Sequence, residues 1–239
     1  MKNLIIAVSS IVTCTLLAHA CPAKSIENQL LNVTVTDGQL QVESLVRGEL
    51  VVPAGCFTHP VQAVQRVELD DETWGKGQSL RLTHDNGWQT CLALYRNCPF
   101  LHVSTTTVGP LRMESCDILC YTVKVGSARL RSYGTGGLEE PGKQEGSYAF
   151  HAAVDGPSRN GVVSGWLTHD RAVGVFMVDS GGSETDEMSL EARLEFGNYR
   201  VKEGQRRQTE TLLIGYFEDA RLGLEAYADA VARQYEIRL

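Results

Sequence analysis

Carboxylates are the side chains of this sequence that are numerous enough to suggest catalysis, since Asp and Glu together number 29 in 239 residues. Two carboxyl groups that cooperate as nucleophile and acid/base must lie about 5 to 5.5 Å apart. Asp70, Asp71 and Glu72 are consecutive, so on a strand they would point to alternate faces. Asp170 and Asp179 flank a short strand segment that would separate them by roughly 25 Å. The sequence therefore predicts no catalytic pair, and the charge run is expected in a solvated loop.

The other motifs that could do chemistry are incomplete. Ser164 lies in Gly-Val-Val-Ser-Gly, which lacks the spacing of a nucleophile elbow. The pair Gly134 and Gly136 lacks the third glycine and the following helix of a dinucleotide-binding loop. Beyond the amino-terminal segment the histidines are dispersed singly, and no C-x2-C or H-x3-H pattern occurs. These histidines are His59, His84, His102, His151 and His169. We therefore expect no metal site and no cofactor.

Two tryptophans are the best candidates for binding a ligand. Trp88 follows the turn that begins at Asp85, and Trp166 lies shortly before His169 and Asp170. An aromatic face beside hydrogen-bonding groups is typical of a carbohydrate-binding surface. The candidate sugar-contact residues are therefore Asp85, Trp88, Trp166, His169 and Asp170. The alternative is that both tryptophans fill the core of the domain.

The amino terminus has the pattern of a secretory signal peptide. Lys2 precedes an apolar run over residues 4–17, and Ala18-His19-Ala20 fits a cleavage site of small residues. We expect a signal peptide over residues 1–20, a secreted or periplasmic protein, and no transmembrane segment, because no apolar run reaches about 20 residues. Cleavage after Ala20 would expose Cys21. Lipid anchoring there is the less favoured alternative, because Ala18 and His19 fit a lipobox poorly.

Export would permit disulfides, and six of the seven cysteines lie beyond the predicted signal peptide. The spacings Cys91-x6-Cys98 and Cys116-x3-Cys120 suit bridges across or beside a hairpin. Six cysteines nevertheless allow 15 connectivities, so the sequence alone cannot choose among them. Buried free thiols are the alternative, because cysteine is among the most buried residue types.

Charge excludes one class of partner. The formal net charge is −7, which becomes −8 if Lys2 is removed with the signal peptide, and Lys and Arg are scattered along the chain. A surface of this kind does not attract phosphate backbones or anionic membranes. Nucleic acid is therefore not an expected partner, whereas a neutral ligand such as a sugar is compatible with this charge.

Short alternating segments recur along the chain at the spacing typical of an antiparallel sandwich. The clearest pair is 31–36 and 40–45, joined by Asp37-Gly38, a strong hairpin signal. Further strands are expected at 63–69, 79–83, 89–95, 101–107, 119–125, 129–133, 148–154, 162–168, 172–178, 190–196 and 210–216. The intervals are too short for crossover helices, so we expect an all-β fold, a large sandwich of two antiparallel sheets.

One segment has helical periodicity instead. Over residues 219–234 the apolar residues Leu224, Tyr227 and Val231 recur on one face, Asp219 can cap the first turn, and Arg233 suits the last. After it, residues 236–239 resemble the start of a further extended segment. We therefore expect a sandwich domain over residues 21–217, and over 218–239 a helix with the beginning of a further domain.

Four ordered stretches, 67–82, 133–138, 159–171 and 214–231, resemble a known family. It is the amino-terminal domain of glycoside hydrolase family 36 and its relatives, the α-galactosidases and raffinose-synthase-type proteins of the melibiase clan. The resemblance covers residues 33–239. It implies a β-supersandwich and a linker helix, followed in such enzymes by a (β/α)8 barrel that carries both catalytic carboxylates. A barrel needs about 250 residues, so it is absent here and no catalytic residue is carried over.

The resemblance leads to the expectation of a secreted, non-catalytic amino-terminal domain, truncated or split from an enzyme that acts on α-galactosides. Its role would be structural, oligomerising or substrate-positioning. Its partner would be the missing catalytic barrel or a second copy of the chain, and Leu224, Tyr227 and Val231 would pack on the barrel. The alternative is a free-standing carbohydrate-binding protein.

Overall fold

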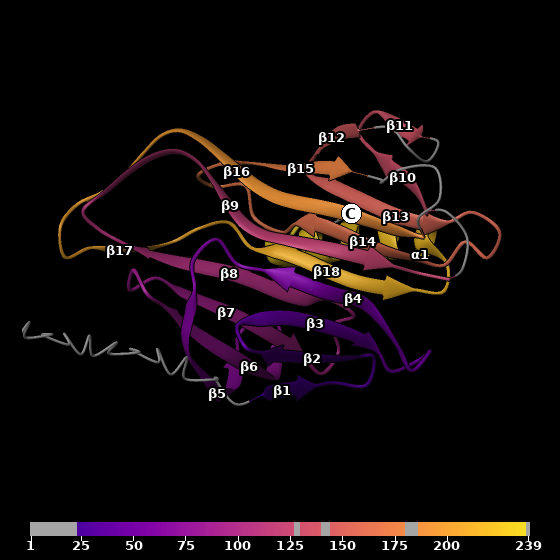
Figure 1. Ribbon diagram of the computed structural model, residues 1–239, viewed down its shortest axis with the longest axis horizontal. Coiled ribbons are helices and arrows are strands. Elements are labelled where there is room, and N and C mark those ends of the chain that lie inside the picture. The colour runs from indigo at the N-terminus through magenta and orange to yellow at the C-terminus, as the bar shows by residue number, and fades with distance from the viewer. Residues whose placement is uncertain (1–22, 127–129, 140–143, 180–185, 238–239) are drawn as a thin grey trace, which may run out of the picture.

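Two antiparallel β-sheets pack face to face, and one helix covers the outer side of one of them (Figure 1). The computed structural model describes residues 23–126, 130–139, 144–179 and 186–237. The predicted all-β sandwich with a helix near the carboxyl terminus is confirmed. The predicted signal peptide and Cys21 lie outside the described residues. Among the described helices, none is long and apolar enough to span a membrane.

The first sheet, here called sheet A, has eight strands in the order β1-β2-β3-β4-β9-β16-β15-β12. Its strands lie toward the viewer in Figure 1. Their bounds are β1 Lys24–Glu27, β2 Leu31–Thr36, β3 Gln39–Ser44, β4 Glu49–Cys56, β9 Leu111–Lys124, β16 Glu187–Val201, β15 Val173–Asp179 and β12 Gln144–Tyr148.

The second sheet, sheet B, has ten strands, nine of them in the order β11-β10-β13-β14-β18-β8-β7-β6-β5, while β17 pairs with β8. Their bounds are β11 Gly137–Glu139, β10 Leu130–Gly134, β13 Phe150–Asp155, β14 Gly161–Trp166, β18 Leu212–Phe217, β8 Leu101–Val108, β7 Gln89–Tyr95, β6 Gly75–His84, β5 Val61–Asp71 and β17 Arg206–Gln208. The helix α1 spans Ala220–Gln234 and lies behind β13 and β14 in Figure 1.

The hairpin predicted from Asp37-Gly38 is present as β2 and β3. Thr36 pairs with Gln39, and both turn residues have positive φ, 50° at Asp37 and 78° at Gly38. Two positive φ values match the right-handed twist of the flanking strands, which is why this dipeptide favours a tight hairpin. Strand β4 was not predicted, because Pro53 and Gly55 interrupt its alternation.

Two apolar layers hold the molecule together. The larger lies between the sheets and contains side chains from both, among them Leu92, Leu119 and Phe176. The smaller lies between the outer face of sheet B and α1, and includes Phe100 and Leu213. Because the helix covers this outer face, all six residues of β14 are buried. A strand buried on both faces loses the polar alternation that marks an ordinary sandwich strand.

The helix face formed by Leu224, Tyr227 and Val231 packs on the domain's own sheet. The Tyr227 hydroxyl donates to the main-chain oxygen of Trp166 at 2.8 Å, and Gly165 provides the space for its ring. The three side chains remain partly exposed, so their predicted packing on a catalytic barrel stays a prediction.

The two ends of α1 are fixed by different contacts. Asp219 caps the first turn, as predicted, by accepting a hydrogen bond from the main-chain NH of Arg221 at 3.0 Å. At the other end, Trp74 donates from Nε1 to Oε1 of Gln234 at 3.1 Å, and the Arg233 guanidinium lies 4.9 Å from the Trp74 ring centre. Trp74 belongs to the turn between β5 and β6, so this turn fixes the carboxyl-terminal end of the helix.

We predict that Gly165→Ala destabilises the domain by about 3 kcal/mol. An added Cβ at this position would lie 2.3 Å from the Tyr227 ring and force the helix away from β14. Gly136→Ala is the matched control, because no atom lies within 4 Å of the Cβ it would add. Urea unfolding of both variants checks this, and equal stabilities would contradict the close packing of α1.

Candidate functional site

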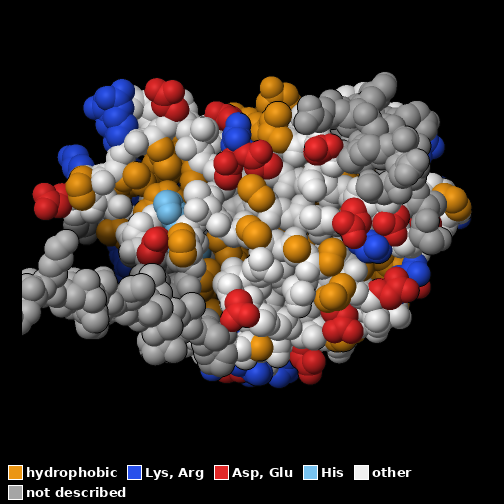
Figure 2. Space-filling model, in the orientation of Figure 1, with side chains coloured by type: hydrophobic (Ala, Val, Ile, Leu, Met, Phe, Trp, Pro, Cys, Tyr) orange, Lys and Arg blue, Asp and Glu red, His pale blue; other side chains and the backbone are white. Residues whose placement is uncertain are grey.

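A groove of about 740 Å³ crosses the exposed face of sheet A. Twelve residues from five strands line it: Ala54, Cys56, Cys120, Tyr121, Thr122, Gly146, Met177, Val178, Asp179, Ser189, Leu190 and Glu191. Figure 2 shows this face, on which acidic and hydrophobic side chains are interspersed among other polar groups. The groove is a candidate binding site because it is concave and carries hydrogen-bonding groups.

Strand register explains why the sheet is hollow at this place. Cys120 of β9 lies opposite both Cys56 of β4 and Glu191 of β16, and Glu191 lies opposite Met177 of β15. The neighbouring row is made of short side chains: Ala54, Thr122 and Ser189 follow one another across β4, β9 and β16. Directly opposite residues share one face of an antiparallel sheet, so these rows of small side chains leave a depression.

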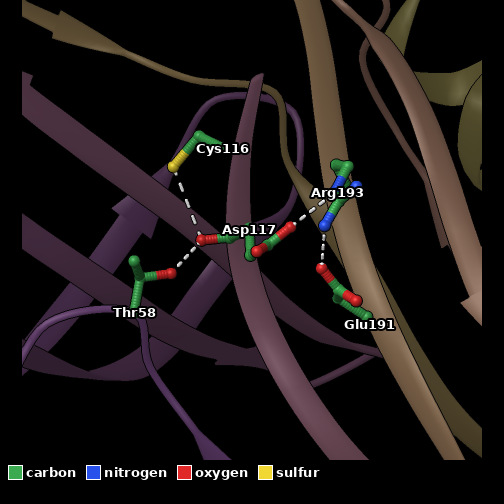
Figure 3. Close-up of polar contacts among 5 residues, drawn as sticks. All are labelled: Thr58, Cys116, Asp117, Glu191 and Arg193. Atoms are coloured by element: carbon green, nitrogen blue, oxygen red, sulfur yellow. Dashed lines mark hydrogen bonds and ion pairs between the residues drawn. The ribbon is translucent and has the colours of Figure 1, made fainter. Parts of the chain in front are cut away.

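Asp117, Glu191 and Arg193 form a charged cluster (Figure 3), and Glu191 is also one of the residues that line the groove. Arg193 donates from Nε to Oδ1 of Asp117 at 2.7 Å and also forms an ion pair with Glu191. The main-chain oxygen of Asp117 accepts hydrogen bonds from the Thr58 hydroxyl and, at 3.4 Å, from the Cys116 thiol. Arg193 and Asp117 lie opposite each other on β16 and β9, while Glu191 is two residues away on the same strand as Arg193.

The two carboxyl groups of this cluster have pKa values that move apart. The nearby Asp117 carboxyl, with burial second, raises the pKa of Glu191 above its ordinary value. Burial acts to raise the pKa of Asp117, but hydrogen bonds with Arg193 and Glu191 outweigh it, so the pKa of Asp117 is lowered. A pair of this kind can hold one proton acid and one carboxylate base. Sequence reasoning missed it, because 76 residues separate Asp117 from Arg193.

The two tryptophans predicted to contact sugar are core residues. Trp166 is 0% exposed, and a Cβ added at Gly174 would lie 2.1 Å from its ring. Trp88 is 7% exposed and belongs to the core between the sheets. Because no ring face of Trp166 reaches solvent, sugar contact by this residue is contradicted. Trp88 also lies in the core, which is the alternative that the sequence left open for both tryptophans.

The other three candidate residues are exposed but do not form one site. Asp85 lies in the turn between β6 and β7, whereas His169 and Asp170 follow the end of β14. Strands β18 and β8 lie between β14 and β7 in sheet B. His169 donates from its main-chain NH to the Tyr235 hydroxyl at 2.9 Å, which in turn lies 3.3 Å from Oδ1 of Asp170. Sugar contact by Asp85, His169 or Asp170 stays a prediction.

Glu210 is a buried carboxylate that sequence reasoning did not single out. It is 0% exposed and accepts hydrogen bonds from the Thr168 hydroxyl and from the main-chain NH groups of Arg171 and Ala172. These bonds fix the loop after β14 to the start of β18. In the sequence, the burial of Glu210 is indicated only by its position, between Thr209 and Thr211 and just before the apolar strand β18. Its hydrogen bonds assign it a structural role.

Cys91, Cys98, Cys116 and Cys120, the residues named as possible disulfide partners, are free thiols in the structure, which is the alternative that the sequence left open. Ala192 of β16 pairs with Leu119 of β9, but the next residue, Arg193, pairs with Asp117, so Ile118 is an extra residue of β9 that forms a β-bulge. This bulge reverses the alternation of the strand. Cys116 is consequently buried, Cys120 is exposed, and the two side chains point to opposite faces.

A buried thiol–imidazole pair lies beneath α1. The sulfur of Cys98 is 3.3 Å from Nε2 of His102. Burial raises the pKa of Cys98 to about 11 and lowers the pKa of His102 to about 3, so both groups stay neutral. A nucleophilic cysteine requires the opposite shifts. Among the described residues there is also no group of three His, Cys, Asp or Glu side chains that could hold a metal ion.

His102 and His151 make the stability of the domain dependent on pH. Burial lowers the pKa of each to about 3, whereas in the unfolded chain each protonates near its ordinary pKa of 6.5. The unfolded state therefore binds more protons below pH 6.5. The free energy of unfolding should fall as the pH decreases from 6.5 toward 3, by about 3–4 kcal/mol between pH 7 and pH 5 for the two groups together.

Urea titrations across this pH range check the prediction. His102→Gln and His151→Gln should each reduce the slope of stability against pH, whatever their effect on stability at pH 7. His169→Gln is the matched control, because His169 is exposed. A slope that is unchanged in both buried-histidine variants would contradict their burial in the neutral form.

We predict that Arg193→Gln destabilises the domain by about 1 kcal/mol at pH 7 and by less at pH 4. The three side chains of the cluster are each about one-third exposed, so solvent screens their charges. Without the guanidinium, two carboxylates repel each other at pH 7, and protonation of Glu191 removes that repulsion on acidification. Lys124→Gln, which removes exposed ion pairs with Asp186 and Glu187, is the control and should change little. An equal loss at both pH values would contradict the coupling of the two carboxyl groups.

Comparison by sequence finds no relative: no protein-family model matches this chain, and no curated protein matches it. Comparison by structure does find similar folds. The α-galactosidase AgaA of glycoside hydrolase family 36 from Geobacillus stearothermophilus, solved in complex with raffinose, matches with a TM-score of 0.54 and 11% identity. The match covers 91% of this chain and 43% of AgaA. The chain therefore spans less than half the length of that enzyme.

Two further structures extend the comparison. The α-N-acetylgalactosaminidase NagBb from Bifidobacterium bifidum matches with a TM-score of 0.56 and 9% identity, over 86% of this chain and 38% of the enzyme. A galactose mutarotase related enzyme from Lactobacillus acidophilus matches with a TM-score of 0.51 and 9% identity, over 82% of this chain and 97% of that protein. The fold resembles the non-catalytic amino-terminal domain of family 36 α-galactosidases, and the match does not extend to their catalytic barrel.

Proposed function

We propose that this chain is a non-catalytic β-supersandwich domain of an α-galactosidase-like glycoside hydrolase, with a structural, oligomerising or substrate-positioning role. The observation that carries the proposal is the fold, which matches AgaA over 91% of this chain but only 43% of the enzyme. The segment over residues 1–20, with its apolar run and small-residue cleavage pattern, supports export to the periplasm or the cell exterior.

The charged cluster supports the non-catalytic part of the proposal. Asp117 and Glu191 are two carboxyl groups that come together on the exposed face of sheet A, and Arg193 pairs with both. A glycosidase pair must admit the sugar between a nucleophile and an acid/base. Here the two carboxyl groups hydrogen-bond with each other and share Arg193 as an ion-pair partner, which favours a cross-strand structural network over hydrolysis.

Helix α1 restricts how a partner could bind. Its apolar face contacts sheet B, which leaves Leu224, Tyr227 and Val231 only partly exposed to a catalytic module or a second copy. The exposed face of sheet A, with its groove, is a large surface left uncovered by the helix. We therefore place the substrate-positioning role, where the domain has one, at sheet A.

The purified chain should not hydrolyse p-nitrophenyl α-galactoside, because no described carboxyl pair is open to a substrate. A family 36 α-galactosidase assayed in parallel provides the positive control for the reagents. Hydrolysis faster than in buffer alone would contradict the proposal if the Glu191→Gln variant no longer showed it. That result would assign catalysis to the charged cluster.

The second candidate function is a free-standing carbohydrate-binding protein. The galactose mutarotase related enzyme favours it, because the match covers 97% of that protein and therefore shows this fold as nearly a whole chain. The groove on sheet A supplies a concave surface with hydroxyl and carboxylate groups, among them Thr122, Asp179 and Ser189. These groups suit hydrogen bonding to a sugar.

Calorimetric titration with galactose, melibiose and raffinose tests the second candidate. Binding at the groove should weaken at least tenfold in Ser189→Tyr, which fills it, and should persist in Ser115→Tyr, an exposed position outside it. Asp85→Asn and Asp170→Asn test in the same titration the exposed positions that the sequence predicted. Absence of binding to every sugar would reject the second candidate and leave the first standing.

A further inference from the structure

Two exposed cysteines lie directly opposite each other where β4 pairs with β9. This pairing consists of three residue pairs, and the last of them joins Cys56 to Cys120. Both side chains are exposed and both thiols are free. Opposite residues on antiparallel strands share one face, with Cβ atoms about 4.5–5.5 Å apart. Their Cα atoms are about 4.5 or 5.5 Å apart, depending on the type of pair, and both values suit a disulfide.

We propose that Cys56 and Cys120 form a reversible cross-strand disulfide. The oxidant is a small disulfide such as glutathione disulfide. The thiolate of Cys56 attacks it, forms a mixed disulfide and releases one glutathione thiol; the thiolate of Cys120 then attacks the sulfur of Cys56 and releases the second. Two protein thiols are oxidised by two electrons, and one glutathione disulfide is reduced to two glutathione thiols.

The other described cysteines are less suited to this reaction. Cys98 and Cys116 are buried, and burial raises the pKa of each thiol to about 11. Cys91 is half-buried, and burial raises its pKa as well. Burial, together with the carboxylates of Glu191 and Asp117, raises the pKa of Cys120. The raised pKa of Cys120 suits this thiol to the second step, which is intramolecular.

The place of the bond gives it a consequence for the fold. Sheet A consists of two groups of strands, β1–β4 on one side and β9, β16, β15 and β12 on the other. The two groups are joined where β4 pairs with β9. Three residue pairs form this junction, whereas twelve join β9 to β16. A disulfide here would close a loop of about 65 residues across the shortest seam of the sheet, and long loops give the largest stabilisation. It would also replace two thiols that line the groove.

The test uses the full chain, reduced with dithiothreitol and then equilibrated at pH 8 with glutathione disulfide and glutathione. After alkylation of free thiols, non-reducing peptide mapping should show one cross-linked peptide pair that contains Cys56 and Cys120. The melting temperature of the oxidised protein should exceed that of the reduced protein by about 5–15 °C. Cys56→Ser/Cys120→Ser should lose this difference, and Cys91→Ser, the control, should keep it.

Three results would overturn the proposal: glutathione that remains attached to Cys56, a cross-link that joins either cysteine to another such as Cys21, or oxidised and reduced proteins that melt at the same temperature. Should the double variant fail to fold, peptide mapping of the unaltered chain still decides the matter. The inference does not rest on the proposed function, since it concerns the sheet alone and would survive discovery of hydrolase activity.

Discussion

Strands β14 and β18 lie at the centre of sheet B and must be buried on both faces, and the rest of the architecture depends on this requirement. Every residue of β14 is buried, as are five of the six in β18. One face is covered by sheet A and the other by α1. Burial of apolar side chains is worth about 25 cal/mol per Å² of surface removed from water, so an uncovered outer face would cost the domain much of its stability.

Close approach of the helix imposes the local sequence. Gly165 and Gly223 stand where a Cβ would collide, at 2.3 Å with Tyr227 and at 2.5 Å with Phe217. The turn between β5 and β6 delivers Trp74 to the far end of the helix, where it contacts Arg233 and Gln234. The helix thus covers the outer face of sheet B at β13, β14 and β18, whereas the groove and the cysteine pair lie on the exposed face of sheet A.

The sequence predicted elements whose signals are local. The Asp37-Gly38 hairpin and the capped helix were predicted because turn geometry and capping depend on a few adjacent residues. The target of the helix face could not be predicted, since an apolar stripe shows that burial is needed but not against what. Trp166 shows the same limit: an aromatic residue beside polar groups has one sequence pattern, whether it binds a sugar or fills a core.

The charged cluster and the cysteine pair were missed for a different reason. Both depend on the register between strands far apart in the chain, β4 with β9 and β9 with β16. The bulge in β9 then places Cys116 and Cys120 on opposite faces, and without the extra residue the two side chains would share one face. Amide hydrogen exchange would test the dependence of the fold on a doubly buried sheet B most directly. We expect the amides in the middle of α1 to exchange as slowly as those of β14 and β18, in one cooperative unit. Rapid exchange throughout α1 while β14 and β18 stay protected would contradict it.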